Sequence, residues 1–273
     1  YDRVPEESVF ATELSGAEKP KMKLRGLLKW TSRVSAGKIS LGRVHMKCGG
    51  PVILDATSSV RQVADDVMDS LQTNTATSTY HLRSFLRHNQ IEGIDLPWLR
   101  RALLRRGGQI IESRLRGEED VSATMEQCMR YQWLHLFYPE AVSAYPGHPA
   151  IRHHCDVNGF ATPTMDVDVD AELADPCVRA LLKALFEPIC RDYVTVAWSL
   201  GSPTGRIEVT NPKALVRRVP TAHLPNIEAC FEDLSSRGIL KETAVSGQYD
   251  WGPNADDIIE YEAMCRWPDD AST

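Results

Sequence analysis

Four carboxylates fall within seven residues near the C-terminus, in the stretch PNADDIIEYEAMC. If this stretch is a helix, Asn254 is a natural N-cap, and Asp256, Asp257 and Glu260 converge because residues three and four apart share a face. If it is a strand, Glu260 and Glu262 share a face instead. Convergent carboxylates could bind a metal ion, a basic substrate or a guanidinium. The same acids would also stabilise the start of a solvated helix.

Two serines could supply a nucleophilic hydroxyl. Ser58 and Ser59 follow residues 51–56, a short apolar run behind two glycines that predicts a buried strand. Apolar residues of 60–71 then recur at helical spacing, so the serines would lie at a helix N-terminus. A serine in that position can accept an acyl group, or it can simply cap the helix.

Glu187 is the candidate for proton transfer. It lies in LFEPI, beside a proline in an apolar setting, within a predicted helix over 174–192. The next residues, YVTVAWS at 193–199, form the strongest candidate for a buried strand. Residues 165–170, MDVDVD, alternate apolar and acidic side chains and predict an exposed or edge strand.

Basic residues concentrate between positions 81 and 116, which hold eight arginines against three acids in a chain of net charge −6. The pattern predicts a helix over 95–117 with leucines on one side. An arginine-rich face in an acidic protein is typical of a phosphate-backbone contact. A solvated face with local salt bridges is the alternative. The arginines concerned are Arg100, Arg101, Arg105, Arg106 and Arg116.

The composition favours a globular protein without a metal site or a membrane span. Seven cysteines are spread along the chain without a CxxC pair, and His153, His154 and Cys155 lack a third ligand at helical spacing. We therefore expect no metal and a reducing, cytoplasmic compartment. No apolar run approaches the roughly 18 residues that a membrane span requires.

Three stretches, in order, resemble the cyclodipeptide synthases: VILDATSSVRQVADDV, LRRALLRRGGQIIESRL and LLKALFEPI. This resemblance implies an α/β fold with a Rossmann-like parallel sheet flanked by helices, similar to class I aminoacyl-tRNA synthetases. It implies an irregular arm over 1–28, a catalytic domain over 29–220 and a C-terminal extension over 221–273 that completes the site. The enzyme class would be an aminoacyltransferase.

The DDIIE stretch is similar to the DDxxE motif of the arginine-containing branch of that family. The resemblance implies that Ser58 or Ser59 accepts the arginyl group of arginyl-tRNA. A second aminoacyl-tRNA then yields a cyclo-Arg-Xaa diketopiperazine, with Glu187 moving protons. Because an aminoacyl-tRNA is already an activated ester, the resemblance implies no cofactor. Asp256, Asp257 and Glu260 would hold the guanidinium, and the five arginines would hold tRNA.

The chain also departs from the family's pattern. Lys183 stands where the family has a tyrosine, a proline follows Glu187 directly, and the usual glycine-containing serine turn is absent.

The last sixty residues allow a second interpretation. NIEACFEDLSSRG predicts an amphipathic helix ended by Gly238, ILKETAV predicts a strand, and IIEYEAMCRW a possible second strand after a loop. This order is typical of the end of a winged helix. The chain would then be a non-enzymatic nucleic-acid or protein interaction factor, and Asp256 and Asp257 would lie in the wing tip and repel nucleic acid.

Overall fold

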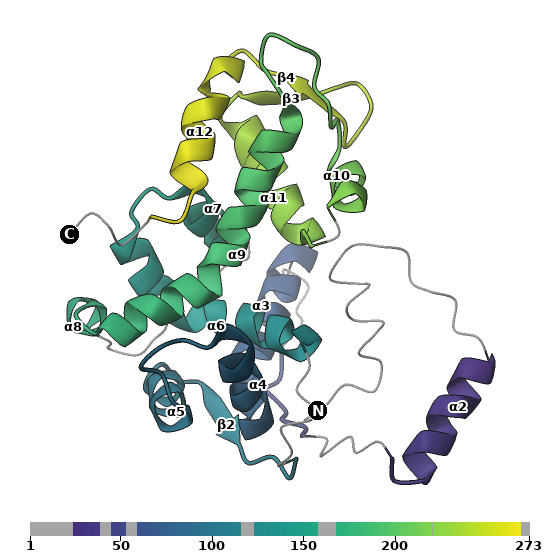
Figure 1. Ribbon diagram of the computed structural model, residues 1–273, viewed down its shortest axis with the longest axis vertical. Coiled ribbons are helices and arrows are strands. Elements are labelled where there is room, and N and C mark those ends of the chain that lie inside the picture. Colours follow the sequence, from purple (N-terminus) through teal and green to yellow (C-terminus); the bar gives the residue numbers. More distant parts are fainter. Residues whose placement is uncertain are drawn as a thin grey trace. The chain divides into compact units, whose positions relative to one another are not determined.

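The structure is a computed structural model that describes residues 24–38, 45–52, 59–115, 123–157, 168–219 and 221–268 (Figure 1). These residues are mostly helical and belong to two compact units. Unit 1 takes most of its described residues from Pro20–Phe137. Unit 2 takes most of its own from Tyr138–Phe160 and Val169–Thr273. No helix in the described ranges is long and apolar enough to cross a membrane.

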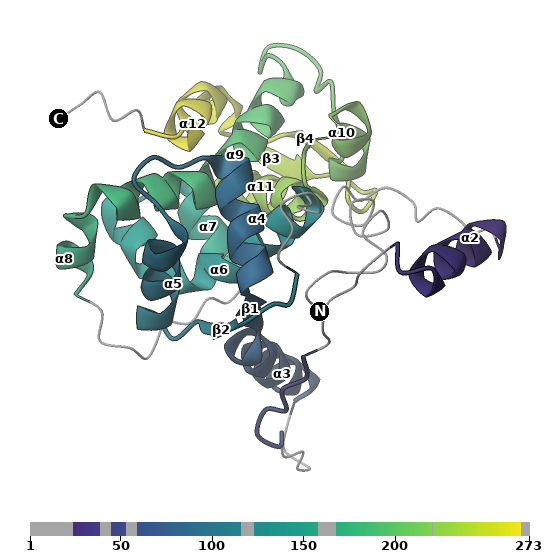
Figure 2. The ribbon, with the colours of Figure 1, turned by 60° about the horizontal axis from the view of Figure 1, so that its bottom comes forward.

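Unit 1 combines helices with one small parallel sheet. Its elements are α2 (Leu24–Ser35), α3 (Val60–Asn74), β1 (Ala76–Ser78), α4 (Thr79–Asn89), α5 (Leu96–Arg105), β2 (Gln109–Ile111) and the first part of α6 (Ala123–Ala144). Figure 2 shows α4 and α5 beside the β1–β2 pair. Trp133 of α6 fills the core: its ring lies 4.8 Å from that of Phe85, and its indole N–H donates to Thr77 Oγ1 at 3.0 Å.

The prediction of a Rossmann-like parallel sheet is wrong for the described residues, which contain no such sheet. They hold one parallel pair of three-residue strands, with Ala76 opposite Gln109 and Ser78 opposite Ile111. Ser78 ends β1 and at once begins α4, because its hydroxyl accepts from the backbone N–H of His81. The strand predicted at 51–56 lies mostly outside the described residues, and residues 51 and 52 have no regular structure.

The strand predicted at 193–199 is wrong, because these residues continue helix α9 (Pro176–Leu200). Tyr193, Val196, Ala197 and Leu200 are buried, which is the i, i+3, i+4, i+7 pattern of a helix face. A strand would have buried alternate residues, yet Trp198 is exposed. The described part of 165–170 also differs from the prediction, since α8 (Val169–Leu173) is helical.

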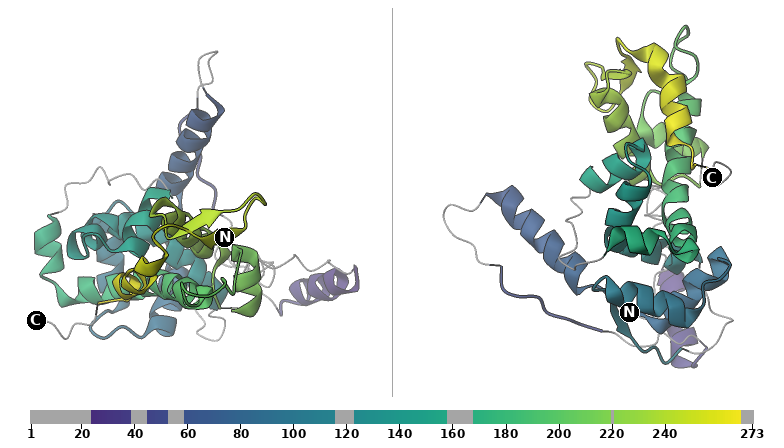
Figure 3. Two further views of the ribbon diagram at one scale, coloured as in Figure 1. Left: turned by 90° about the horizontal axis from the view of Figure 1, so that it is seen from above. Right: turned by 90° about the vertical axis from the view of Figure 1, so that its left-hand side faces the viewer.

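Unit 2 is built around α9. Its other elements are the end of α6, α7 (Pro149–Val157), α8, α10 (Pro212–Arg218), α11 (Leu224–Ser236), β3 (Leu240–Glu242), β4 (Tyr249–Trp251), η1 (Ala255–Asp257) and α12 (Ile258–Cys265). Helices α7, α8, α11 and α12 pack against α9. Figure 3 shows α12 beside α9 from two further directions. The possible second strand at 258–267 is therefore wrong, because residues 258–265 form α12, and β4 takes that place earlier in the chain.

Residues 211–251 form what we call the helix–hairpin module: α10, α11 and the antiparallel pair β3–β4. Gly238 ends α11 with a positive φ of 71°, as predicted, and turns the chain into β3. A Cβ at Gly252 would lie 2.2 Å from the carbonyl oxygen of Gly238, so only glycine fits where β4 leaves the hairpin. Leu240 pairs with Trp251 and Glu242 with Tyr249.

Candidate binding groove in the helix–hairpin module

The predicted catalytic residues fall in different units. Ser59 belongs to unit 1 and is exposed; its hydroxyl accepts from the backbone N–H of Gln62 at 3.1 Å and so caps the start of α3. Ser58 lies outside the described residues. Glu187 belongs to unit 2 and is exposed on α9, so the apolar setting expected for it is wrong. Neither unit by itself holds both members of the predicted pair.

The three acids of DDIIE lie on the surface of unit 2. Asp256 and Asp257 are in η1 and Glu260 is in α12, and all three side chains are exposed. Asn254 stands at the N-cap position of η1, but its side chain makes no capping bond and instead donates to the Arg237 carbonyl at 2.8 Å. Within the described ranges no three His, Cys, Asp or Glu side chains come together as metal ligands.

The predicted tRNA-binding arginines divide into exposed and buried members. Arg100, Arg101 and Arg105 are exposed, and Arg100 forms an ion pair with Glu112. Arg106 is 2% exposed: its guanidinium donates to the Ala102 carbonyl at 2.9 Å and lies 4.3 Å from the Phe137 ring centre. Arg116 lies outside the described residues. One predicted contact residue is therefore part of the core of unit 1.

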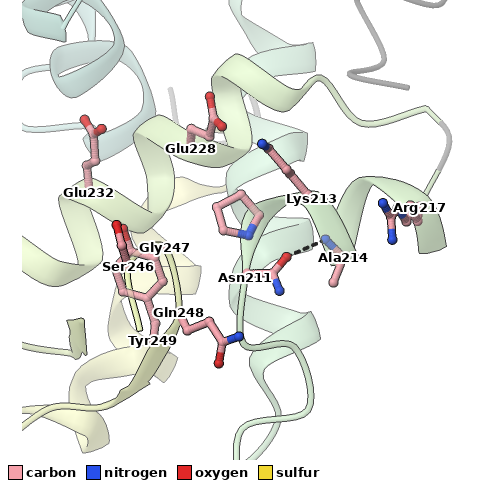
Figure 4. Close-up of a pocket in the computed structure, with 11 residues that line it drawn as sticks. Asn211, Lys213, Ala214, Arg217, Glu228, Glu232, Ser246, Gly247, Gln248 and Tyr249 are labelled. Atoms are coloured by element: carbon pink, nitrogen blue, oxygen red, sulfur yellow. Dashed lines mark hydrogen bonds between the residues drawn. The ribbon is translucent and has the colours of Figure 1, made fainter. Parts of the chain in front are cut away.

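The helix–hairpin module contains an open groove with a volume of about 540 Å³. The groove lies between α10, α11 and the hairpin loop, which comprises residues 243–248. Pro212, Ala214 and Tyr249 form its less exposed floor. Exposed charged side chains form its rim. Figure 4 shows Glu228 and Glu232 projecting from α11 and Lys213 and Arg217 from α10, with Gln248 on the loop.

A buried carboxylate of α9 fixes the N-terminus of α11. His223, at the N-cap position, makes no side-chain cap. Asp192 replaces it: its Oδ2 accepts from the His223 backbone N–H at 3.3 Å and from the Asn226 side chain at 2.7 Å. The first bond satisfies a backbone N–H that a helix N-terminus leaves open, and the two bonds together hold the start of α11 against α9.

A second buried carboxylate fixes the C-terminal half of α11. Asp233 accepts from the Tyr261 hydroxyl of α12 at 2.8 Å and from Arg237 Nε at 3.0 Å. Burial, followed by the nearby Cys230, Cys265 and Asp233, raises the pKa of Tyr261, so this phenol stays neutral and donates. The inner face of α11 is thus anchored, and its outer face is left to carry Glu228 and Glu232.

A tilted contact between two aromatic rings and several backbone bonds hold the hairpin in place. The Tyr249 ring lies 5.0 Å from the Phe231 ring, and the Tyr249 backbone N–H donates to Thr210 at 2.8 Å. Gly247, with φ of 72°, donates its N–H to the Glu242 carboxylate at 2.6 Å and shapes the loop. The segment just before α10 is therefore bonded to β4 through Thr210.

The electrostatics of the groove differ between its two sides. Burial raises the pKa of Tyr249, and the carboxylates of Glu242, Glu232 and Glu228 raise it further, which places negative potential over the floor. Lys213 and Arg217 supply positive charge on the α10 side. In the described part of the chain, no ion pair or hydrogen bond joins either base to Glu228 or Glu232.

This arrangement is suited to binding rather than to covalent catalysis. The hydroxyls that line the groove belong to Ser246 and Tyr249, and neither is hydrogen-bonded to a histidine or carboxylate among the described residues. An unactivated hydroxyl is a weak nucleophile. Two walls of opposite charge over an aromatic floor instead favour recognition of a ligand that carries both charges.

Sequence reasoning did not single out the groove residues. Glu228 and Glu232 are four residues apart, opposite the apolar face of the predicted helix, which marks them as surface residues. Lys213 and Arg217 have the same spacing in PKALVRR. Their meeting with the hairpin loop depends on tertiary packing, for which the sequence holds no local signal.

Comparison of the chain with protein-family models, with curated proteins and with solved structures gives no match. Function is therefore inferred from the groove and its chemistry.

Proposed function

We propose that the chain is a non-enzymatic interaction factor whose C-terminal module is winged-helix-like and binds a protein partner. The order of elements supports this: α9, a connecting segment that bonds to β4 through Thr210, α10, α11, β3, a loop and β4. In helix-turn-helix modules the second helix of the pair is the one that reads a partner. Here that helix is α11, and the β3–β4 hairpin takes the position of the wing.

The acidic outer face of α11 is the reason for proposing a protein partner instead of a nucleic acid. A recognition helix that enters a DNA groove passes close to two rows of phosphates, and lysine and arginine normally neutralise them. The outer face of α11 instead presents Glu228 and Glu232, and Glu242 stands at the base of the hairpin loop. These carboxylates would repel phosphates, whereas protein partners carry basic side chains that complement them.

Peptide selection tests this proposal. Random displayed peptides are selected against the full chain, and the enriched peptides are measured against the double variant Glu228→Lys with Glu232→Lys. We expect at least tenfold weaker binding to the variant, since two favourable charges become two unfavourable ones. The matched control, Asp256→Lys with Asp257→Lys, makes the same change in charge on exposed acids that do not line the groove.

Nucleic-acid binding is measured on the same protein. If duplex DNA or structured RNA binds more tightly at physiological salt than every selected peptide, and the glutamate variant leaves peptide binding unchanged, the proposal is overturned.

The tRNA-dependent cyclodipeptide synthase remains a prediction from sequence resemblance. Its test is a coupled reaction with total tRNA, aminoacyl-tRNA synthetases, ATP and all amino acids, followed by mass spectrometry for cyclo-Arg products. A product that requires both arginine and tRNA would establish that activity in place of an interaction factor.

A further inference from the structure

We propose that the groove selects a partner segment that carries one basic and one acidic side chain close together. The basic group would lie against Glu228 and Glu232, and the acidic group against Lys213 and Arg217. This inference rests on the proposed function and names the chemistry of the partner.

The first reason is that the two walls present complementary charges without pairing with each other. Glu228 and Glu232 project from α11 and Lys213 and Arg217 from α10 (Figure 4), and all four side chains are exposed. No ion pair or hydrogen bond links the two walls in the residues that the structure describes. Four charges that line one groove and leave one another unpaired remain available to a ligand that spans it.

The second reason is the way each charge is held. Asp192 and Asp233 anchor the inner face of α11, so Glu228 and Glu232 stand one helical turn apart on a fixed helix. On α10, the Asn211 side chain accepts from the Ala214 backbone N–H at 2.7 Å and caps the helix that carries Lys213 and Arg217. Fixed walls reduce the ordering that a ligand must impose when it binds.

The third reason is the floor between the walls. Tyr249 is half-buried, packs its ring at a tilt against that of Phe231 and remains a neutral phenol beside the carboxylates. Its ring and the buried Pro212 offer apolar surface to the aliphatic stem of an arginine or lysine. The guanidinium then reaches the glutamates, for which its fork of donors is well suited.

A negatively charged macromolecule satisfies these observations less well. A nucleic acid or an anionic lipid would neutralise Lys213 and Arg217, yet it would bring phosphates against Glu228 and Glu232. A segment with one charge of each sign satisfies both walls at once, and each wall then disfavours the opposite orientation.

The experiment uses short peptides with acetylated and amidated ends, so that only side chains carry charge. The reference peptide joins arginine to glutamate through a glycine spacer, and the spacer length that binds most tightly is used thereafter. One matched peptide replaces arginine with citrulline, which has the same shape without the charge. The other replaces glutamate with glutamine. Calorimetry on the full chain is expected to show at least tenfold weaker binding for each matched peptide.

Two double variants assign each charge to its wall. Glu228→Gln with Glu232→Gln should no longer distinguish arginine from citrulline, but it should still distinguish glutamate from glutamine. Lys213→Gln with Arg217→Gln should show the reverse pattern. The control Asp256→Asn with Asp257→Asn should discriminate between the peptides as the unaltered chain does.

Equal affinity for the three peptides, absence of binding at every spacer length, or unchanged discrimination in both double variants would each overturn the inference. A different result would overturn the proposed function itself: displayed peptides of any composition would then bind equally well to the chain with and without the groove substitutions. Selected peptides that require the groove but carry no charged pair would overturn only this inference.

Discussion

Arginines occur on α5 of unit 1 and on α10 of unit 2, but they have different surroundings. On α5, Arg100 is paired with Glu112, and Arg106, just past the end of the helix, is buried against Phe137. On α10, Arg217 and Lys213 line a groove and face carboxylates with which they form no ion pair among the described residues. The density of basic residues in the sequence points to α5, whereas the unpaired and complementary charges are on α10 and α11. The pairing of charges, more than their number, indicates where a partner can bind.

The largest effect that sharpens this comparison is expected at Arg106. Arg106→Glu places an unpaired carboxylate in the core and removes the bond to Ala102 and the contact with Phe137. We expect the free energy of unfolding to fall by about 3 kcal/mol or more. Arg101→Glu, an exposed position on the same helix, should change it by less than about 0.5 kcal/mol. Urea denaturation measures both, and similar values for the two variants would contradict the structural role of Arg106.

The next largest effect is expected at Asp233. Asp233→Ala leaves the Tyr261 hydroxyl and Arg237 without their carboxylate acceptor and loosens α11 from α12. We expect a loss of about 2–3 kcal/mol in the free energy of unfolding. The neighbouring Glu232→Ala, on the exposed face of α11, should cost less than about 0.5 kcal/mol. A large loss at Glu232 would show that the groove face also supports the fold.

A smaller effect depends on pH through His148. Burial lowers the pKa of His148, whose Nε2–H donates to the Arg266 carbonyl at 3.2 Å. Below pH 6.5 the histidine is therefore protonated more readily in the unfolded chain than in the folded protein. Stability is fully present above the unfolded pKa of about 6.5 and is lost as pH falls toward the lowered folded value.

The loss from one such histidine is at most about 1.4 kcal/mol per pH unit. His148→Gln keeps a donor for the carbonyl and should flatten the decline between about pH 6.5 and 5. The pKa of His135 is also lowered by burial, so part of the decline should remain. Thermal unfolding across this range makes the measurement, and an unchanged slope would show that His148 is not the titrating group.

The smallest effect on stability is expected in the groove itself. Neutralising Glu228 and Glu232 with glutamine removes exposed carboxylates that are unpaired within the described ranges. The free energy of unfolding should change by less than about 0.5 kcal/mol. A loss comparable to that of Asp233→Ala would mean that these charges stabilise the module and are not held for a ligand.

Local periodicity in the sequence predicts several helices and the strand β3, but neither the β1–β2 pair nor the groove. The apolar spacing of 60–71 and the glycine at 238 correctly indicate α3 and the end of α11. Residues 193–199 mislead because valine, threonine and aromatic side chains favour strands in general, while packing of a helix face decides here. The prediction for Arg106 is wrong because this residue follows the last residue of α5 and has a ψ of 16°. Helical spacing therefore no longer indicates on which side its side chain lies.

The groove could not be predicted because its walls come from three separate stretches, 211–217, 228–232 and 246–249. Each stretch is an ordinary polar surface in the sequence. Their meeting depends on buried side chains such as Asp192 and Phe231, whose contacts cross between elements. Local patterns do not encode such contacts.

Photo-crosslinking tests the central claim most directly. A selected peptide that carries a diazirine is bound to the full chain and irradiated, and the attachment site is mapped by mass spectrometry. The account predicts attachment to α11 or to the hairpin loop at 243–248, with loss of crosslinking in Glu228→Lys with Glu232→Lys. Attachment to α5 around Arg101, or crosslinking that survives the glutamate substitutions, would contradict it.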